Sequence, residues 1–130
     1  MMNREYRMGK VVRIDDLEIR TEEFALSIIE LFTSLPKNVE TQIIDKQVLR
    51  SGTSVGANYR EGCRARSSQK FVAKLRICLQ ELEETQYWLE LLGESNYVKE
   101  EITKYLYDEA NELMAIFVSS FCLLHSKFLL

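Results

Sequence analysis

The feature of this sequence with the clearest chemical meaning is a run of basic side chains with few acids near it. Its members are Arg60, Arg64, Arg66, Lys70 and Lys74, where one predicted helix ends and the next begins. Basic residues at the start of a helix, here Arg66 and Lys70, oppose the positive end of the helix dipole and favour a bound anion. Two interpretations are open. The charges either keep a turn hydrated or bind the phosphates of a nucleic acid, with salt-sensitive affinity and little reading of base sequence.

Charge is unevenly distributed along the chain. Residues 41–80 contain eight of the 17 basic residues and two of the 20 acidic ones, which leaves nine basic and 18 acidic residues elsewhere. The formal net charge of −3 hides this separation. Such asymmetry indicates an anionic partner for the middle of the chain, or an acidic surface supplied by its own ends or by another copy.

A second candidate set forms a polar stripe on the helix expected over residues 39–62. Its members are Arg50, Ser54, Asn58 and Glu61, which lie away from the line of core residues. Arg50 and Glu61 are about 16 Å apart along the helix axis, too far to pair with each other. The stripe therefore either packs within the monomer or forms a network between subunits, in which Arg50 meets Glu61 or an acid of the third helix of another copy.

Two glycines, Gly52 and Gly56, lie inside the same expected helix. A glycine in a helix interior is unfavourable by about 0.5–1 kcal/mol relative to alanine, so another interaction must offset it. Close approach of a second helix would do so, and we expect these glycines to allow it. The segment lacks the Lys-Ser/Thr ending and the preceding strand of a phosphate-binding loop.

Several classes of function are disfavoured. The chain has one histidine and no Glu-x-x-His pair, so it lacks the usual ligands of a zinc or di-iron site. We therefore expect no metal, no cofactor and no enzyme activity. Three widely spaced cysteines read as reduced thiols. The sequence lacks an apolar run of about 20 residues and a secretory signal, so a cytoplasmic protein with no membrane partner is expected.

The pattern of apolar residues predicts four amphipathic helices after a peripheral arm over residues 1–15. The first helix ends at Pro36, the second covers about 39–62, the third runs from Ser67 or Ser68 to Gly93, and the fourth covers about 97–127. The fourth carries apolar residues at helical spacing: Ile102, Leu106, Ala110, Leu113, Phe117, Phe121, Leu124 and Phe128. Short connections between such helices predict an all-α, antiparallel up-down-up-down four-helix bundle over residues 16–130.

The segment RSGTSVGANYREGCRARS at residues 50–67, followed by the leucine-rich ELEETQYWLELL, resembles a known family. It is similar to the four-helix-bundle proteins encoded in intervening sequences of bacterial 23S ribosomal RNA genes. The family pattern of Arg, Ser and small residues, Asn-x-x-Glu-Gly and Arg falls on Arg50, Ser51, Gly52, Ser54, Asn58, Glu61, Gly62 and Arg64. The resemblance extends from about residue 17 to the C-terminus.

This resemblance implies self-association and nucleic-acid binding, because the family is similar to accessory proteins of diversity-generating retroelements. Those proteins form pentameric barrels and bind nucleic acid and a reverse transcriptase. We therefore expect a homo-oligomer, as a pentameric ring, that binds RNA or DNA electrostatically, with structured RNA preferred. The alternative is a homo-oligomeric protein-interaction scaffold without a nucleic-acid ligand, whose partner is another protein.

Overall fold

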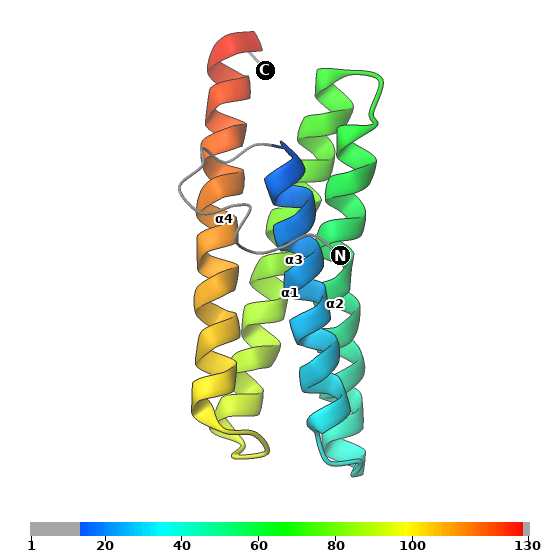
Figure 1. The fold of residues 1–130 in the computed structure, drawn as a ribbon, viewed down its shortest axis with the longest axis vertical. Helices are drawn as coiled ribbons and strands as arrows, with labels where there is room; N and C mark the ends of the chain where they lie inside the picture. Colours follow the sequence, from blue (N-terminus) through cyan, green and yellow to red (C-terminus); the bar gives the residue numbers. More distant parts are fainter. Residues whose placement is uncertain (1–13, 129–130) are drawn as a thin grey trace.

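The computed structural model describes residues 14–128, which form four antiparallel helices (Figure 1). The helices are α1 (Ile14–Ser34), α2 (Val39–Cys63), α3 (Ser68–Glu94) and α4 (Glu100–Phe128). The α2–α3 turn lies at one end of the bundle and the other two connections lie at the opposite end. Each helix packs along the next one in the sequence, and the contact between α1 and α4 is less extensive. The predicted all-α four-helix bundle is confirmed.

The arm expected over residues 1–15 lies outside the described residues except at its end. There, Ile14 and Asp15 form the beginning of α1. The helix thus starts two residues before the domain boundary expected at residue 16.

Local signals at the helix ends explain where the helices begin and stop. The first helix ends two residues before Pro36, because a proline disfavours helical geometry in the residue that precedes it. Asn38 caps α2 by accepting a hydrogen bond from the Thr41 N–H at 2.9 Å. Ser67 caps α3 by accepting one from the Lys70 N–H at 3.2 Å.

The core is built from one apolar stripe of each helix. The buried apolar residues of these stripes include Phe24, Ile28, Leu31, Leu35, Val48, Val55, Tyr59, Leu75, Cys78, Leu82, Leu89, Leu92, Leu106, Ala110, Leu113 and Phe117. Where the stripe of α2 becomes small and polar, Ser51 Oγ and Thr85 Oγ1 are hydrogen-bonded at 2.8 Å, which satisfies both buried hydroxyls. None of the helices within residues 14–128 combines the length and the apolar character needed to span a membrane.

The prediction that Gly93 ends the third helix is wrong. The helix continues to Glu94, and Asn96 takes the positive φ of 62° that follows the helix end. A Cβ on Gly93 would lie 3.0 Å from Thr103 Oγ1. The glycine therefore allows α4 to approach α3 closely rather than terminating the helix.

The fourth helix also departs from the prediction. It begins at Glu100 instead of residue 97, and Ile102 is 42% exposed although its spacing matched the core residues. Thr103, its neighbour, is buried in its place and donates a hydrogen bond to the Glu100 carbonyl. Phe121 is half-buried, and the side chains of Leu124 and Phe128 lie outside the described ones.

Close approach of α1 and α2 occurs at the two glycines. A Cβ on Gly52 would lie 2.8 Å from Ile28 Cγ1, and one on Gly56 would lie 3.2 Å from Thr21 Oγ1. A contact of 2.8 Å is too short for two carbon atoms, so a larger residue at position 52 requires α1 or the Ile28 side chain to move.

One charged residue is buried in the α1–α2 half of the bundle. The side chain of Asp45 is 2% exposed, and neither carboxylate oxygen has a hydrogen-bond partner. Its nearest cation is the Lys37 ammonium group, 3.6 Å from Oδ2. Lys37 is also held by the Phe32 carbonyl at 3.2 Å and lies over the Phe32 ring. Burial raises the pKa of Asp45, and the nearby Lys37 opposes that rise.

Replacing Gly52 by leucine is expected to lower the thermal stability of the fold. The added side chain collides with Ile28, and such overpacking costs about 1–3 kcal/mol, more than the gain in helix propensity returns. Ala73→Leu, at an exposed site on α3, is the matched control and leaves the melting temperature nearly unchanged. Circular dichroism melts of the two variants and the wild type measure this, and a Gly52→Leu variant more stable than wild type contradicts the packing argument.

Asp45 makes the pH dependence of stability opposite in sign to that of an ordinary carboxylate. Because its pKa is raised in the folded state, folding binds a proton, and the stability from this site is present at low pH and lost as pH rises through the folded pKa. Asp45→Asn removes the titration. We expect wild type to gain stability relative to Asp45→Asn when the pH falls from about 7 to about 4, near the ordinary pKa of an aspartate.

Urea denaturation of both proteins at the two pH values checks this expectation. Lys37→Met, which removes the nearest cation, serves as the companion variant and is expected to destabilise the fold more at the higher pH. If the difference between wild type and Asp45→Asn is independent of pH, the carboxylate does not titrate in this range.

Candidate nucleic-acid interface

The predicted basic residues lie on the last turn of α2, on the short connection to α3 and on the first two turns of α3. Arg64 forms the C-cap of α2, and its N–H donates to the carbonyls of Glu61 and Gly62. The Ala65 N–H also donates to the Gly62 carbonyl, at 3.0 Å. Arg66 then precedes the Ser67 cap of α3. Backbone hydrogen bonds thus hold the turn, while the arginine side chains are left exposed.

The five predicted basic residues fall into two groups. Arg60 pairs with Glu22 of α1 at 2.7 Å, and Lys74 pairs with Glu61 across the α2–α3 contact at 2.5 Å. The other three basic residues make no ion pair within the described part of the chain. These are Arg64, Arg66 and Lys70. Arg64 directs one guanidinium nitrogen to the Arg60 carbonyl at 3.4 Å. Three of the five predicted basic residues, at the end of α2, in the turn and in the first turn of α3, are therefore not neutralised by an ion pair.

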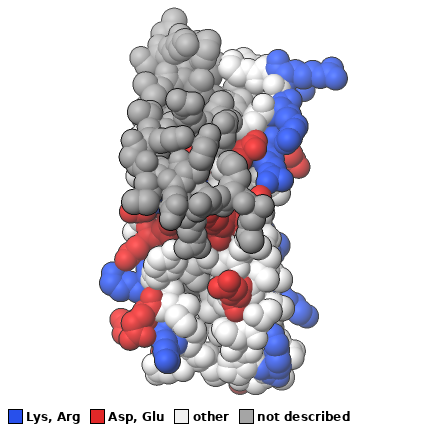
Figure 2. All heavy atoms as spheres, in the orientation of Figure 1, with Lys and Arg blue, Asp and Glu red and all other residues white. Residues whose placement is uncertain are grey.

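Helix electrostatics add to this positive charge. The first turn of α3 contains no acidic residue, although acids are favoured there, and it contains Lys70 instead. The Lys70 N–H, one of the first in the helix, donates a hydrogen bond to the Ser67 side chain that caps it. Figure 2 shows several basic side chains at the end of the molecule where α2 and α3 meet, with a few acidic ones beside them, and a mixture of acidic and basic side chains on the part of this face formed by α1 and α4. The tip of the turn can attract and bind anions.

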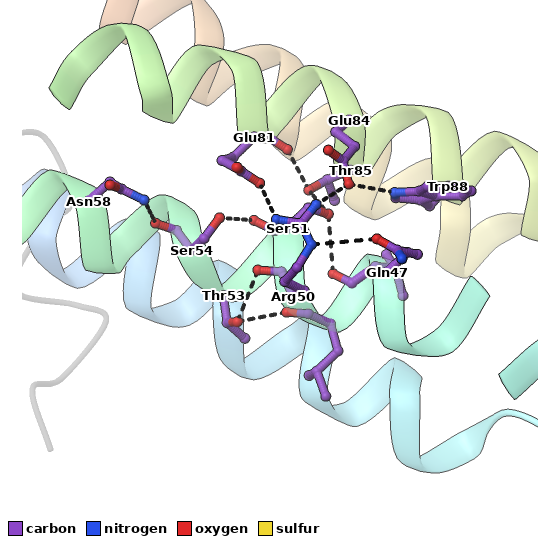
Figure 3. Close-up of polar contacts among 12 residues, drawn as sticks. Gln47, Arg50, Ser51, Thr53, Ser54, Asn58, Glu81, Glu84, Thr85 and Trp88 are labelled. Atoms are coloured by element: carbon purple, nitrogen blue, oxygen red, sulfur yellow. Dashed lines mark hydrogen bonds and ion pairs between the residues drawn. The ribbon is translucent and has the colours of Figure 1, made fainter. Parts of the chain in front are cut away.

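Arg50 contacts two carboxylates of α3 in its own chain (Figure 3). Its guanidinium group lies 3.2 Å from Glu81 Oε2 and also pairs with Glu84. The Trp88 indole N–H donates to Glu84 at 3.0 Å. This hydrogen bond and the Arg50 charge lower the pKa of Glu84. The sequence suggested Glu61 or an acid of the third helix as the partner of Arg50. The partners are acids of the third helix, and they belong to the same chain.

The remaining members of the predicted polar stripe do not join Arg50 in one network. Ser54 Oγ donates to the Ser51 carbonyl at 2.8 Å, and Asn58 Nδ2 donates to the Ser54 carbonyl at 2.8 Å. Both therefore hydrogen-bond to the backbone of their own helix (Figure 3). Glu61, the last residue of the stripe, is paired with Lys74.

Sequence reasoning missed two polar contacts that join distant helices. Arg20 of α1 lies 2.7 Å from Glu109 of α4 and also pairs with Glu112. Gln86 of α3 donates to the Tyr107 carbonyl at 3.2 Å and to Asn111 Oδ1 at 2.8 Å. The burial of Gln86 was detectable, because it lies four residues after Leu82 on the apolar side of its helix.

Asp45 was also missed as a buried group. Its spacing of four from Thr41 and three from Val48 places it on the buried side of α2, a signal that its charge obscured. Elsewhere, no group of three or more His, Cys, Asp and Glu side chains within the described residues is arranged to hold a metal ion.

Comparisons with known proteins identify the relatives of this fold. A similar solved structure is a protein of unknown function from the S23 ribosomal protein family of Bacteroides thetaiotaomicron VPI-5482. It is 37% identical, with a TM-score of 0.76, and the similarity covers 81% of this chain and 97% of that one. A search of curated proteins gave no match. The profile of the 23S rRNA-intervening sequence proteins matches residues 16–119, so the chain belongs to the 23S rRNA-intervening sequence protein family.

Proposed function

We propose that this protein is a non-enzymatic, self-assembling four-helix bundle that binds nucleic acid through the α2–α3 turn. The observation that carries the proposal is the group of three exposed cations without ion-pair partners in the described chain: Arg64, Arg66 and Lys70. We call these residues the basic tip. Phosphate oxygens would supply the missing negative charge, and the adjacent start of α3 would favour it further.

RNA is the preferred ligand in this proposal. The family is named for 23S rRNA-intervening sequences, and the similar Bacteroides protein belongs to a family named for a ribosomal protein. Both names agree with an RNA partner, and an electrostatic site reads the backbone rather than the bases. Binding that depends on the folded shape of an RNA is therefore expected to show little dependence on its sequence.

Burial disfavours two of the three thiols and the Tyr59 hydroxyl as nucleophiles. Burial raises the pKa of the Cys78 thiol to about 12 and also raises those of Cys63 and Tyr59. At neutral pH none of these side chains supplies an anionic nucleophile.

Self-assembly is supported by the distribution of exposed apolar residues. The helices of the α1–α4 face expose Leu26, Ile29, Ile102, Tyr105 and Val118, and those of the α2–α3 face expose Val39, Ile43 and Tyr87. These faces lie on opposite sides of the bundle because the helices follow one another around it. We propose that the first face of one copy packs on the second face of another. Contacts of this head-to-tail kind close into rings, and a pentamer remains the expected size.

Removing the basic tip is expected to weaken nucleic-acid binding and its salt dependence. The Arg64→Ser, Arg66→Ser, Lys70→Ser variant neutralises up to three fewer phosphates, so the slope of log affinity against log salt falls by about 0.7–0.9 for each of them. Fluorescence anisotropy with a structured RNA at several salt concentrations measures this slope. Helix content and oligomer size are expected to stay unchanged.

The matched control removes three exposed lysines elsewhere, Lys46, Lys99 and Lys104, and changes the net charge equally. It is expected to bind nearly as wild type does. The scaffold alternative gives a different result, namely no binding by the wild type and loss of assembly in the basic-tip variant. Binding that does not depend on salt would contradict the phosphate interface.

Head-to-tail assembly makes a specific prediction for charge introduced on either face. Ile43 is 62% exposed and Tyr105 is 61% exposed, so Ile43→Glu and Tyr105→Glu leave the core intact. Each variant alone is expected to be a folded monomer, because each has one damaged face. An equimolar mixture is expected to form heterodimers through the two undamaged faces.

Light scattering coupled to size exclusion distinguishes these states. Gln42→Glu, an exposed polar site next to Ile43, is the control and is expected to keep the wild-type size. If the wild-type protein is a monomer at a concentration of tens of micromolar, the assembly proposal is wrong. If both variants are monomers and remain monomers when mixed, the contact is instead symmetric, with the same face of each copy packed on its counterpart.

A further inference from the structure

A hollow of about 310 Å³ opens beside the α2–α3 turn. It is shallow and open to solvent, so a ligand there would lie against its wall rather than be enclosed. The residues that matter for its chemistry are Gly62, Cys63, Ala65, Arg66, Ser67 and Phe71. The hollow therefore adjoins the basic tip and has one large aromatic side chain in its wall.

The wall around Phe71 is apolar and contains small residues. Phe71 is half-buried and packs against the core. A Cβ on Gly62 would lie 3.0 Å from the Cβ of Lys74 and 3.2 Å from Phe71 Cδ1, so the glycine allows the Phe71 ring to pack closely against the end of α2 and holds it in place. Cys63 and Ala65 are small, and burial raises the pKa of Cys63, which keeps its thiol uncharged at neutral pH. Nothing in this wall repels a flat, uncharged ring.

The rim of the hollow has the opposite character. Arg66 lines it directly, and Arg64 and Lys70 lie within a few residues of it along the turn and α3. These three cations have no ion-pair partner within the described residues. An apolar wall bordered by unpaired cations matches the two halves of a nucleotide, a flat base and a charged phosphate.

We propose that the hollow takes one unstacked nucleobase of a single-stranded segment, with Phe71 against the base and the basic tip on the neighbouring phosphates. This inference rests on the proposed nucleic-acid function and specifies the form of the ligand. A base within a duplex is paired and stacked, so it cannot enter a hollow without leaving the helix. Loops, bulges and single strands present bases that are free to do so. The separate positions of the three cations favour a strand over a free mononucleotide.

The test compares ligands of equal length that differ in base accessibility. Anisotropy titrations use a 12-nucleotide single-stranded RNA, the same strand annealed to its complement, the same strand with abasic sites at its centre, and adenosine monophosphate as competitor. We expect the intact single strand to bind most tightly, the duplex and the abasic strand to bind more weakly, and the mononucleotide to compete only at much higher concentration.

Phe71→Leu removes the aromatic face while it preserves an apolar side chain. Stacking of a base on an aromatic residue has an effect equivalent to roughly 5- to 100-fold in affinity. We expect a loss in this range for the single strand, with an unchanged salt slope and little change for the duplex. Phe32→Leu is the matched control, because Phe32 is a half-buried phenylalanine next to the α1–α2 connection, at the opposite end of the bundle.

A spectroscopic reading separates stacking from a general loss of affinity. 2-Aminopurine placed at successive positions of the single strand is expected to change in fluorescence when its base enters the hollow. The change is expected with wild type and Phe32→Leu and to be absent with Phe71→Leu. Ala65→Leu enlarges a residue of the turn rather than the core and is also expected to abolish the fluorescence change. It serves as a second test if the Phe71→Leu protein folds poorly.

The outcomes distinguish this inference from the function on which it rests. Salt-dependent binding that needs the basic tip but is equal for single strand, duplex and abasic strand would overturn the base site and leave the phosphate interface intact. The same holds if Phe71→Leu and Ala65→Leu bind the single strand as wild type does. If the wild type binds none of these RNAs, the proposed function and the base site both fail.

Discussion

The close packing of α2 against both of its neighbours is the constraint on which the rest of the structure depends. Gly52 allows contact with Ile28 of α1, and Gly62 allows contact with the Cβ of Lys74 in α3. Between them, the hydrogen bond that Thr85 donates to Ser51 replaces the apolar side chains that a bundle core would otherwise contain. With small residues on its inner side, α2 lies deep between the two helices. This close packing brings the end of α2 and the start of α3 together and concentrates the basic residues of both at a short turn.

Ion pairs determine which of those charges are left for a ligand. Glu22 and Glu61 neutralise the two basic residues that lie along the sides of the bundle, Arg60 and Lys74. Further along the same helices, Arg50 is held by Glu81 and Glu84. The three residues of the basic tip make no ion pair within the described part of the chain, although Glu61 precedes Arg64 by one helical turn. Exposed ion pairs contribute little to stability, so their main effect here is to localise charge.

Polar contacts between helices fix the alignment of the bundle along its axis. Gln86 joins α3 to α4, and Arg20 joins α1 to α4, where the apolar packing is least extensive. Sliding one helix past another would separate these groups and leave buried polar atoms without partners. Asp45 differs from these paired polar groups, because its carboxylate is buried beside Lys37 without a hydrogen bond. Its burial raises the pKa of the carboxyl group, which is the basis of the pH dependence expected for the α1–α2 half of the bundle.

The sequence by itself determined the fold and the location of the basic run. The recurrence of apolar residues every three or four positions, Pro36 and the Ser67 cap are local signals, and they gave the helices, their order and the α2–α3 turn. Local signals failed at Gly93 and Ile102, where the approach of α3 and α4 decided which residues are buried. Only the tertiary structure decided which cations are neutralised, because ion pairing depends on contacts between residues far apart in the chain, such as Arg60 with Glu22. The hollow beside Phe71 likewise exists only because two helices and a turn meet there, and no single segment encodes it.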